Sequence, residues 1–221
     1  MQLEYIVREP AAAESELPLS IIVFHGYGAN EHDLVPIASA LSKSAKIISL
    51  RGPIELPWGG YAWYHLEQTP QGLRSDTASR LESEVIIIGS LPEIIRKERI
   101  DPSNIILMGF SQGTAMCYSL LSRNDFAAVG ISLKAVVALS GYVPQDIITP
   151  LSKKDLHGLP VFISHGEFDE VIPFSALAES SKYLAEAQAV VTSRHYPIGH
   201  GINDEVLSDL KKWFSSNISW K

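Results

Sequence analysis

Cysteine is almost absent from this chain of 221 residues, in which Cys117 is the only one. A single cysteine excludes a disulfide within the chain and is typical of a reducing compartment, so we expect a cytoplasmic location. Basic residues are also outnumbered: 18 Lys and Arg stand against 25 Asp and Glu, which gives a net charge of −7. This charge argues against nucleic acids and anionic membrane surfaces as partners.

The chain also lacks an apolar run long enough to span a membrane, and its start has no basic region followed by an apolar stretch. We therefore expect neither an integral membrane segment nor a secretory signal. No internal repeat, low-complexity tract or linker interrupts the sequence, and 46% of its residues are apolar. These values predict a single domain over residues 1–221 with a substantial core.

The sequence does contain a regular alternation of short aliphatic runs and amphipathic stretches. We expect strands at residues 2–8, 20–25, 46–50, 104–110, 134–140, 160–165 and 189–196, and helices at 33–43, 76–98, 112–121, 173–187 and 203–216. This order predicts an α/β fold with a mostly parallel sheet of about seven strands and helices on both faces. In such sheets the loops beyond the carboxyl ends of the strands carry the chemistry.

Local signals add detail to this outline. Asp33 is expected to cap the first helix, and Pro92 to bend or restart the second. Residues 10–18 are expected to form a polar connector, residues 51–71 an irregular segment, and residues 144–158 mostly loop.

The stretch Gly109-Phe-Ser-Gln-Gly113 lies at a predicted strand-to-helix junction. This G-x-S-x-G pattern is typical of a nucleophile elbow, in which a strained turn lifts the serine hydroxyl out of the sheet. Glycines two residues away on each side are needed because the strand and helix approach closely there. We therefore interpret Ser111 as a nucleophile, with a structural turn serine as the alternative.

Two further residues complete a catalytic set, because each follows a later strand in the order expected of this elbow. Asp169 follows the strand at 160–165, and His200 follows the last strand between two glycines. A serine needs a base to remove its proton, and a carboxylate behind the imidazole fixes its tautomer. Glu167 and Glu170 compete with Asp169 for the role of the acid.

The remaining histidine assignments are structural. His165 ends one strand and His195 lies within another, while His25 is expected to order the loop that follows it. A surface role for His200 remains the alternative to its role as base. The spacing of histidines and acids matches no metal site, so we expect no metal.

Two backbone N–H groups should form an oxyanion hole, one from Gln112 and one from the glycine-containing loop after the strand at 20–25, for which Tyr27 is the best candidate. The same loop, Gly26-x-Gly28-x-x-Glu31, falls short of a dinucleotide fingerprint because its third glycine is Glu31. Arg51, which ends the next strand in place of an acid, could suit a 2′-phosphate, so this alternative stays open.

Taken together, the motifs resemble the carboxylesterase/phospholipase family of α/β-hydrolases, which includes acyl-protein thioesterases and lysophospholipase-like esterases. The matching motifs are Gly26-Tyr-Gly28, Gly109-Phe-Ser-Gln-Gly113, Leu139-Ser-Gly-Tyr142, His165-Gly-x-x-Asp169-x-Val-x-Pro173 and Gly199-His-Gly201. The resemblance implies an α/β-hydrolase fold without a large lid. It also implies a Ser111–His200–Asp169 triad and oxyanion donors from Tyr27 and Gln112. Many members of the family have a second glycine at the position of Thr114. This difference argues against the protein-depalmitoylating branch of the family.

The aromatic segment at residues 56–66 has two interpretations. It is either a core plug, in which tryptophans cover the sheet edge, or an apolar wall of an acyl-binding groove, which the resemblance favours. The candidate substrate-binding residues are Trp58, Tyr61, Trp63 and Tyr64. In such a groove each buried methylene would contribute up to about 0.8 kcal/mol until the groove is filled. We therefore expect an optimum at short to medium acyl chains.

We therefore expect a serine carboxylesterase that needs no cofactor and acts on a small-molecule acyl ester, thioester or lysophospholipid. The alternative is a catalytically silent hydrolase fold that serves as a binding module. The sequence does not decide the oligomeric state, and a homodimer stays an alternative to a monomer.

Overall fold

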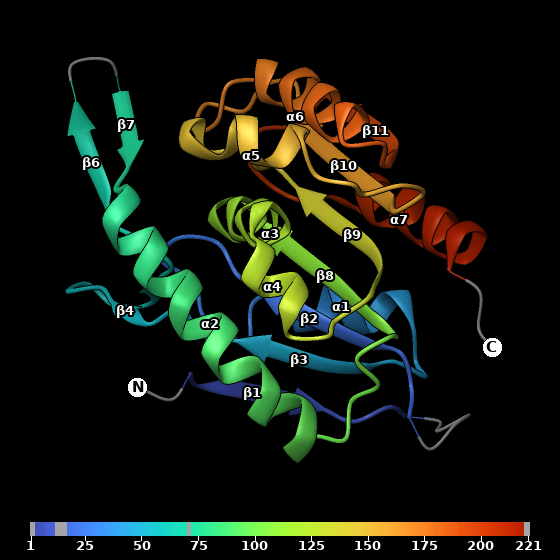
Figure 1. Ribbon diagram of the computed structural model, residues 1–221. Helices are drawn as coiled ribbons and strands as arrows, with labels where there is room; N and C mark the ends of the chain where they lie inside the picture. The colour runs from blue at the N-terminus through green and yellow to red at the C-terminus, as the bar shows by residue number, and fades with distance from the viewer. Residues whose placement is uncertain (1–2, 12–16, 70–71, 219–221) are drawn as a thin grey trace.

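A seven-stranded sheet forms the centre of the computed structural model, which describes residues 3–11, 17–69 and 72–218 (Figure 1). Its strand order is β1-β3-β2-β8-β9-β10-β11. The bounds are Tyr5–Arg8 (β1), Ser20–Phe24 (β2), Lys46–Leu50 (β3), Ile105–Phe110 (β8), Leu133–Leu139 (β9), Pro160–Gly166 (β10) and Val190–Tyr196 (β11). Only β1, at one edge, runs antiparallel to its neighbour. The mostly parallel sheet and the edge position of the first strand are therefore confirmed. The middle of the expected connector, residues 12–16, lies outside the described residues.

Helices cover both faces of this sheet (Figure 1). One face carries α1 (Val35–Leu41) and α7 (Asp204–Asn217). The other carries α2 (Thr77–Lys97), α3 (Gln112–Ser122), α4 (Asn124–Ala128), α5 (Ile148–Ser152) and α6 (Ser175–Glu186). In the part of the chain that the structure describes, no helix is long and apolar enough to cross a membrane.

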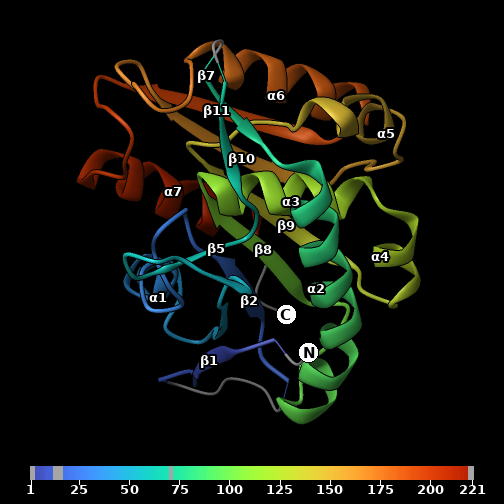
Figure 2. The same cartoon turned by 90° about the vertical axis from the view of Figure 1, so that its left-hand side faces the viewer.

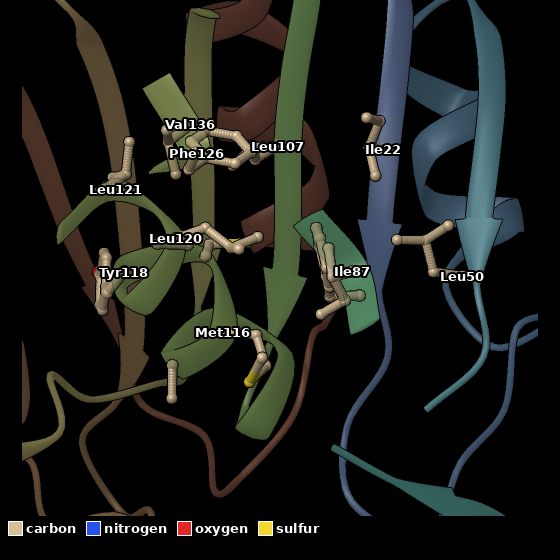
Figure 3. Packing of buried hydrophobic residues seen from close by; sticks show 14 of the residues in the cluster. Ile22, Leu50, Ile87, Leu107, Met116, Tyr118, Leu120, Leu121, Phe126 and Val136 are labelled. Atoms are coloured by element: carbon tan, nitrogen blue, oxygen red, sulfur yellow. The ribbon is translucent and has the colours of Figure 1, made fainter. Parts of the chain in front are cut away.

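The core consists of two apolar layers, because successive strand residues point to opposite faces of the sheet. On β2, Ile21 contributes to the layer under α1 and α7, while Ile22 contributes to the layer under α2 and α3. Figure 3 shows the second layer, where Leu107 and Val136 of neighbouring strands lie on the same side as Leu120 of α3. Strands buried on both faces explain why their sequences read as continuous aliphatic runs.

Residues 51–69 and 72–75 contain two small antiparallel ribbons, whereas residues 51–71 were expected to be irregular; residues 70–71 lie outside the described residues. One pairs β4 (Ile54–Glu55) with β5 (Tyr61–Ala62), and the other pairs β6 (Leu66–Thr69) with β7 (Gly72–Ser75). The β6–β7 ribbon stands at the N-terminal end of α2 (Figure 2). Neither ribbon is a large lid, and the described residues contain no other element that would be one.

Several local predictions are wrong. Asp33 does not cap α1: the side chain of Asn30 accepts the N–H of His32 and opens a turn that leads into the helix, where Leu34 is the N-cap. The helix α2 does not restart at Pro92, so of the two predicted effects only a bend stays a prediction. Residues 144–158 contain a 3₁₀ turn at Gln145–Ile147 as well as α5, and α4 was not expected at all.

Candidate active site

Ser111 lies at the carboxyl end of β8, on a strained turn. Its φ of 54° and ψ of −116° are rare for a residue with a side chain and cost on the order of 1–3 kcal/mol. The strain is held by the surroundings, because the Ser111 N–H donates to the Leu139 carbonyl at 2.8 Å and α3 begins at the next residue. The side chain is placed at the N-terminus of α3, where the helix dipole favours negative charge.

The glycines on either side of Ser111 are required by close packing. A Cβ at Gly113 would lie 2.0 Å from the Phe24 carbonyl oxygen, and one at Gly109 would lie 2.5 Å from the Gly113 backbone. Both distances are far below van der Waals contact. The turn therefore admits only glycine at these positions, which agrees with the steric argument made from the sequence.

The structure brings Ser111, His200 and Asp169 together from the ends of three strands. His200 Nε2 lies 2.9 Å from Ser111 Oγ, and His200 Nδ1 lies 2.7 Å from Asp169 Oδ2. The Asp169 carboxylate accepts only, so Nδ1 carries the ring proton and Nε2 is free to accept the hydroxyl proton. The side chain of Asp169 is fully buried, and that of His200 is 16% exposed.

The carboxylate of Asp169 stays ionised despite its burial. Burial by itself raises its pKa, but hydrogen bonds from the Ile172 N–H, the His200 ring and the Val171 N–H outweigh burial and hold the pKa below its usual value. Both N–H groups donate to Oδ1, at 2.8 and 2.9 Å. An acid that is ionised at neutral pH therefore lies behind the imidazole.

The two competing acids lie elsewhere. Glu167 is paired with His195, whose Nδ1 lies 2.6 Å from the Glu167 carboxylate, and Glu170 is exposed. The His200 ring also packs against Phe110, with ring centroids 5.0 Å apart.

The backbone beside Ser111 offers two unused donors. Within the described residues, neither the Tyr27 N–H nor the Gln112 N–H has a hydrogen-bond partner. The loop that carries Tyr27 is close to the serine, since a Cβ at Gly26 would lie 3.6 Å from Ser111 Cβ. This arrangement can accept a developing negative charge next to the hydroxyl.

The loop that carries Tyr27 is fixed by an ion pair. Arg51 donates from Nε and Nη2 to the two oxygens of the buried Glu31 carboxylate, at 2.7 and 2.5 Å. These bonds lower the pKa of Glu31 to about 2. Arg51 is thus committed to Glu31 and is not available for a 2′-phosphate, which removes the basis of the dinucleotide alternative.

The aromatic segment is divided between core and surface. Trp63 is 0% exposed, and its ring packs against Phe24 and His25 at 5.3 and 5.2 Å between centroids. Tyr64 is equally buried, with its hydroxyl 2.9 Å from that of Tyr142. These two side chains form the core plug and offer no surface to a substrate, so their assignment to a groove wall is wrong.

Trp58 and Tyr61 differ from that pair. Trp58 is 71% exposed, and Tyr61 is half-buried with its ring 4.7 Å from the Arg51 guanidinium. Their ribbon is attached to the loop that carries Tyr27, because the Gly28 N–H donates to the Tyr61 carbonyl and the Tyr61 N–H donates to the Ala29 carbonyl.

Sequence reasoning missed the anchoring role of the Gln112 side chain. Its Oε1 accepts the Trp63 N–H at 2.7 Å, and its Nε2 donates to the Tyr64 carbonyl at 2.8 Å. A buried amide directly after the serine was the available signal, since buried amides require partners. Thr114 is likewise an anchor: its hydroxyl accepts the Leu139 N–H and lies 2.8 Å from the Gly109 carbonyl.

His25 links two loops, as expected of a structural residue. Its Nε2 accepts the Gly52 N–H at 2.9 Å, so Nδ1 carries the proton and donates to the Gly26 carbonyl at 2.7 Å. Burial lowers the pKa of His25. Among the residues that the structure describes, no group of three or more His, Cys, Asp or Glu could hold a metal ion.

Comparisons with known proteins identify the family and the fold. The sequence profile described as phospholipase/carboxylesterase matches residues 6–218. Acyl-protein thioesterase 1 of Yarrowia lipolytica is 26% identical over 96% of each chain. The carboxylesterase of Bacillus cereus superposes with a TM-score of 0.81 at 22% identity, covering 98% of this chain and 95% of its own. A protein named YahD, solved with malic acid, gives 0.84 at 21% identity over 98% and 100%.

Proposed function

The chain belongs to the phospholipase/carboxylesterase family, and from that premise we propose that it is a serine hydrolase that cleaves carboxylic esters through an acyl-enzyme. The observation that carries the proposal is the hydrogen-bonded series from Ser111 Oγ through His200 to Asp169, at 2.9 and 2.7 Å. A hydroxyl, an imidazole and a buried carboxylate in this order are what nucleophilic catalysis by serine requires.

In this mechanism His200 Nε2 takes the proton of Ser111 as the hydroxyl oxygen attacks the acyl carbonyl carbon. Asp169 holds the ring in the required tautomer and stabilises the imidazolium. The N–H groups of Tyr27 and Gln112 donate to the oxyanion. The imidazolium then protonates the leaving alcohol or thiol, and water enters by the same steps to release the acid. The mechanism uses no cofactor.

The first experiment is labelling with a fluorophosphonate probe together with hydrolysis of p-nitrophenyl butyrate. Ser111→Ala and His200→Ala should abolish labelling or slow it strongly, and each should lower kcat by several orders of magnitude. Asp169→Asn should lower kcat by about 10⁴, as a comparable change does in a serine protease. Glu170→Gln is the matched control, because Glu170 is exposed and lies next to Asp169.

Folded wild-type protein that neither labels nor turns over any ester would refute the proposal and indicate a binding module instead. Thioesters and lysophospholipids belong in the same substrate panel, because one relative is named an acyl-protein thioesterase.

We assign the acyl chain to the side of the site where Trp58 stands. Its ribbon packs on the loop that carries Tyr27 so closely that a Cβ at Gly60 would lie 2.0 Å from the Gly28 carbonyl oxygen. An exposed tryptophan in that place can cover an apolar chain without moving the donors. Two added methylenes could then raise kcat/KM by roughly tenfold.

A series of p-nitrophenyl esters from acetate to palmitate tests this assignment. The wild type should prefer short to medium chains, and Trp58→Ala should flatten the dependence on chain length. Val190→Ala is the control, since Val190 is also exposed but begins β11 at the opposite end of the sheet. An unchanged chain-length dependence in Trp58→Ala would refute the assignment while leaving the hydrolase proposal intact.

A further inference from the structure

A second histidine touches the acid of the site. His165, in β10, is 1% exposed, and its Nε2 lies 3.0 Å from the Ile172 carbonyl oxygen and 3.4 Å from Asp169 Oδ2. The carbonyl and the ionised carboxylate are both acceptors only, so Nε2 must carry the ring proton. This N–H group therefore donates to the carbonyl that ends the Asp169–Ile172 turn, and it lies beside the carboxylate without a hydrogen bond to it.

The other ring nitrogen of His165, Nδ1, makes no comparable contact. Nδ1 of His165 is buried and has no hydrogen-bond partner within the described residues. A buried polar atom without a partner costs about 1–3 kcal/mol, so an apolar side chain of similar size would suit this position better on packing grounds alone. The contact made by Nε2 is thus the feature that distinguishes histidine here.

The contacts of Asp169 show what that donor adds. Oδ1 is held by the N–H groups of Val171 and Ile172. Among the residues that the structure describes, the side chains that approach Oδ2 are His200 and His165. His200 changes its charge during the proposed reaction, so His165 is the one neighbour of Oδ2 that stays constant while the proton moves.

We infer that His165 is a positioning residue: its Nε2–H, which donates to the Ile172 carbonyl and lies beside Asp169 Oδ2, holds the Asp169–Ile172 turn so that Oδ2 stays aligned with His200. The inference rests on the proposed function. His165 itself touches no substrate and transfers no proton. It acts through Asp169, whose alignment determines how well the imidazolium of His200 is stabilised.

Another titratable pair, His195 and Glu167, lies near His165. Phe174 stands beside His165 with ring centroids 6.3 Å apart, and His195 lies on Phe174 at 5.8 Å. His195 is in turn paired with Glu167. His195 is also the register partner of His165 on the neighbouring strand β11. The titratable groups that the structure places beside His165 are therefore Asp169 and His195, with Glu167 bonded to His195, and His200 is reached through Asp169.

The test compares His165→Gln with His165→Asn. The amide nitrogen of Gln can reach the place of Nε2, whereas that of Asn reaches only the place of Nδ1, so the two variants differ in the donor while both remain polar. His165→Leu removes the donor altogether. For each variant we would measure kcat, KM, the acid limb of kcat/KM against pH, and the urea unfolding midpoint.

His165→Asn should lower kcat by about 10²-fold with KM unchanged, because a small misplacement of the acid is costly. Its acid limb should move to lower pH, since a misaligned carboxylate stabilises the imidazolium less. His165→Gln should recover most of kcat and the wild-type limb. Wild-type kcat and pH profile in His165→Asn, or equal loss in both amides, would overturn the inference.

The same data separate this inference from the proposed function. An active wild type whose His165 variants lose only stability refutes the positioning role alone. An inactive, unlabelled wild type refutes the hydrolase first. If His165→Leu fails to fold, the comparison of the two amides still decides.

Discussion

Trp63→Ala is the substitution that most directly tests the division of the aromatic segment between core and surface. The side chain is 0% exposed, and its Nε1 donates to the His25 carbonyl at 2.9 Å. Removing a buried tryptophan costs about 3–5 kcal/mol through lost burial and the cavity left behind. The His25 carbonyl would in addition lose a buried partner, at about 1–3 kcal/mol.

These costs are large beside the 5–15 kcal/mol by which a domain is ordinarily stable. Trp63→Ala should therefore lower the urea midpoint sharply with an unchanged m-value, and Trp63→Phe should lose less because it keeps much of the ring. Trp58→Ala is the matched control and should change the free energy of unfolding by less than about 0.5 kcal/mol.

The outcome that would refute this reasoning is the reverse pattern. A Trp63→Ala protein that keeps wild-type stability but loses its preference among acyl chain lengths would return Trp63 to the wall of a groove. Equilibrium unfolding followed by circular dichroism, on the same preparations used for ester hydrolysis, measures both properties.

Three further predictions follow from buried contacts. Gly113→Ala should lower the free energy of unfolding by roughly 1–3 kcal/mol and slow fluorophosphonate labelling, because its Cβ would meet the Phe24 carbonyl. Gly89→Ala is the control and should be neutral or stabilising, because the space around Gly89 is open. Equal stability of the two variants would contradict the close approach at Gly113. Because Arg51 lowers the pKa of Glu31 below its ordinary value, their pair stabilises the fold at neutral pH and this contribution is lost as the pH falls from about 4.5 to about 2. In urea denaturation, the free energy of unfolding that Glu31→Gln removes should shrink as the pH falls through this range. A loss that stays the same at every pH would contradict the prediction. Burial raises the pKa of the Cys117 thiol, so a disulfide reagent should label it only after unfolding, and rapid labelling of the native protein would show that the site opens.

The sheet and the long helices could be predicted because their signals are local. The aliphatic runs of β2 and β8 are fully or almost fully buried. The second helix was expected from residue 76, and there Asp76 caps α2 by accepting the N–H groups of Ala78 and Ser79. The helices α4 and α5 were missed because five residues are too few to show a periodic pattern.

The rest of the site depends on contacts between distant segments. An aromatic cluster has the same composition whether it covers a groove or fills the core, and only the packing of Trp63 on Phe24 decides between them. The histidine at position 165 stands four residues before Asp169, a spacing that alone cannot show that its ring turns back onto the carboxylate. Arg51 and Glu31 are likewise joined only by the fold.

The close backbone approaches around the site bear on how such an enzyme can change. Gly60 lies against the Gly28 carbonyl, and a Cβ at Gly166 would lie 2.2 Å from the Gly199 carbonyl oxygen. The groups that we propose to react are therefore positioned by direct packing of one backbone segment on another. Side chains that project from the same loops, such as Trp58 and the exposed Phe168, take no part in that support. Selection in the laboratory could vary them freely and give new substrate preferences to an unaltered catalytic frame.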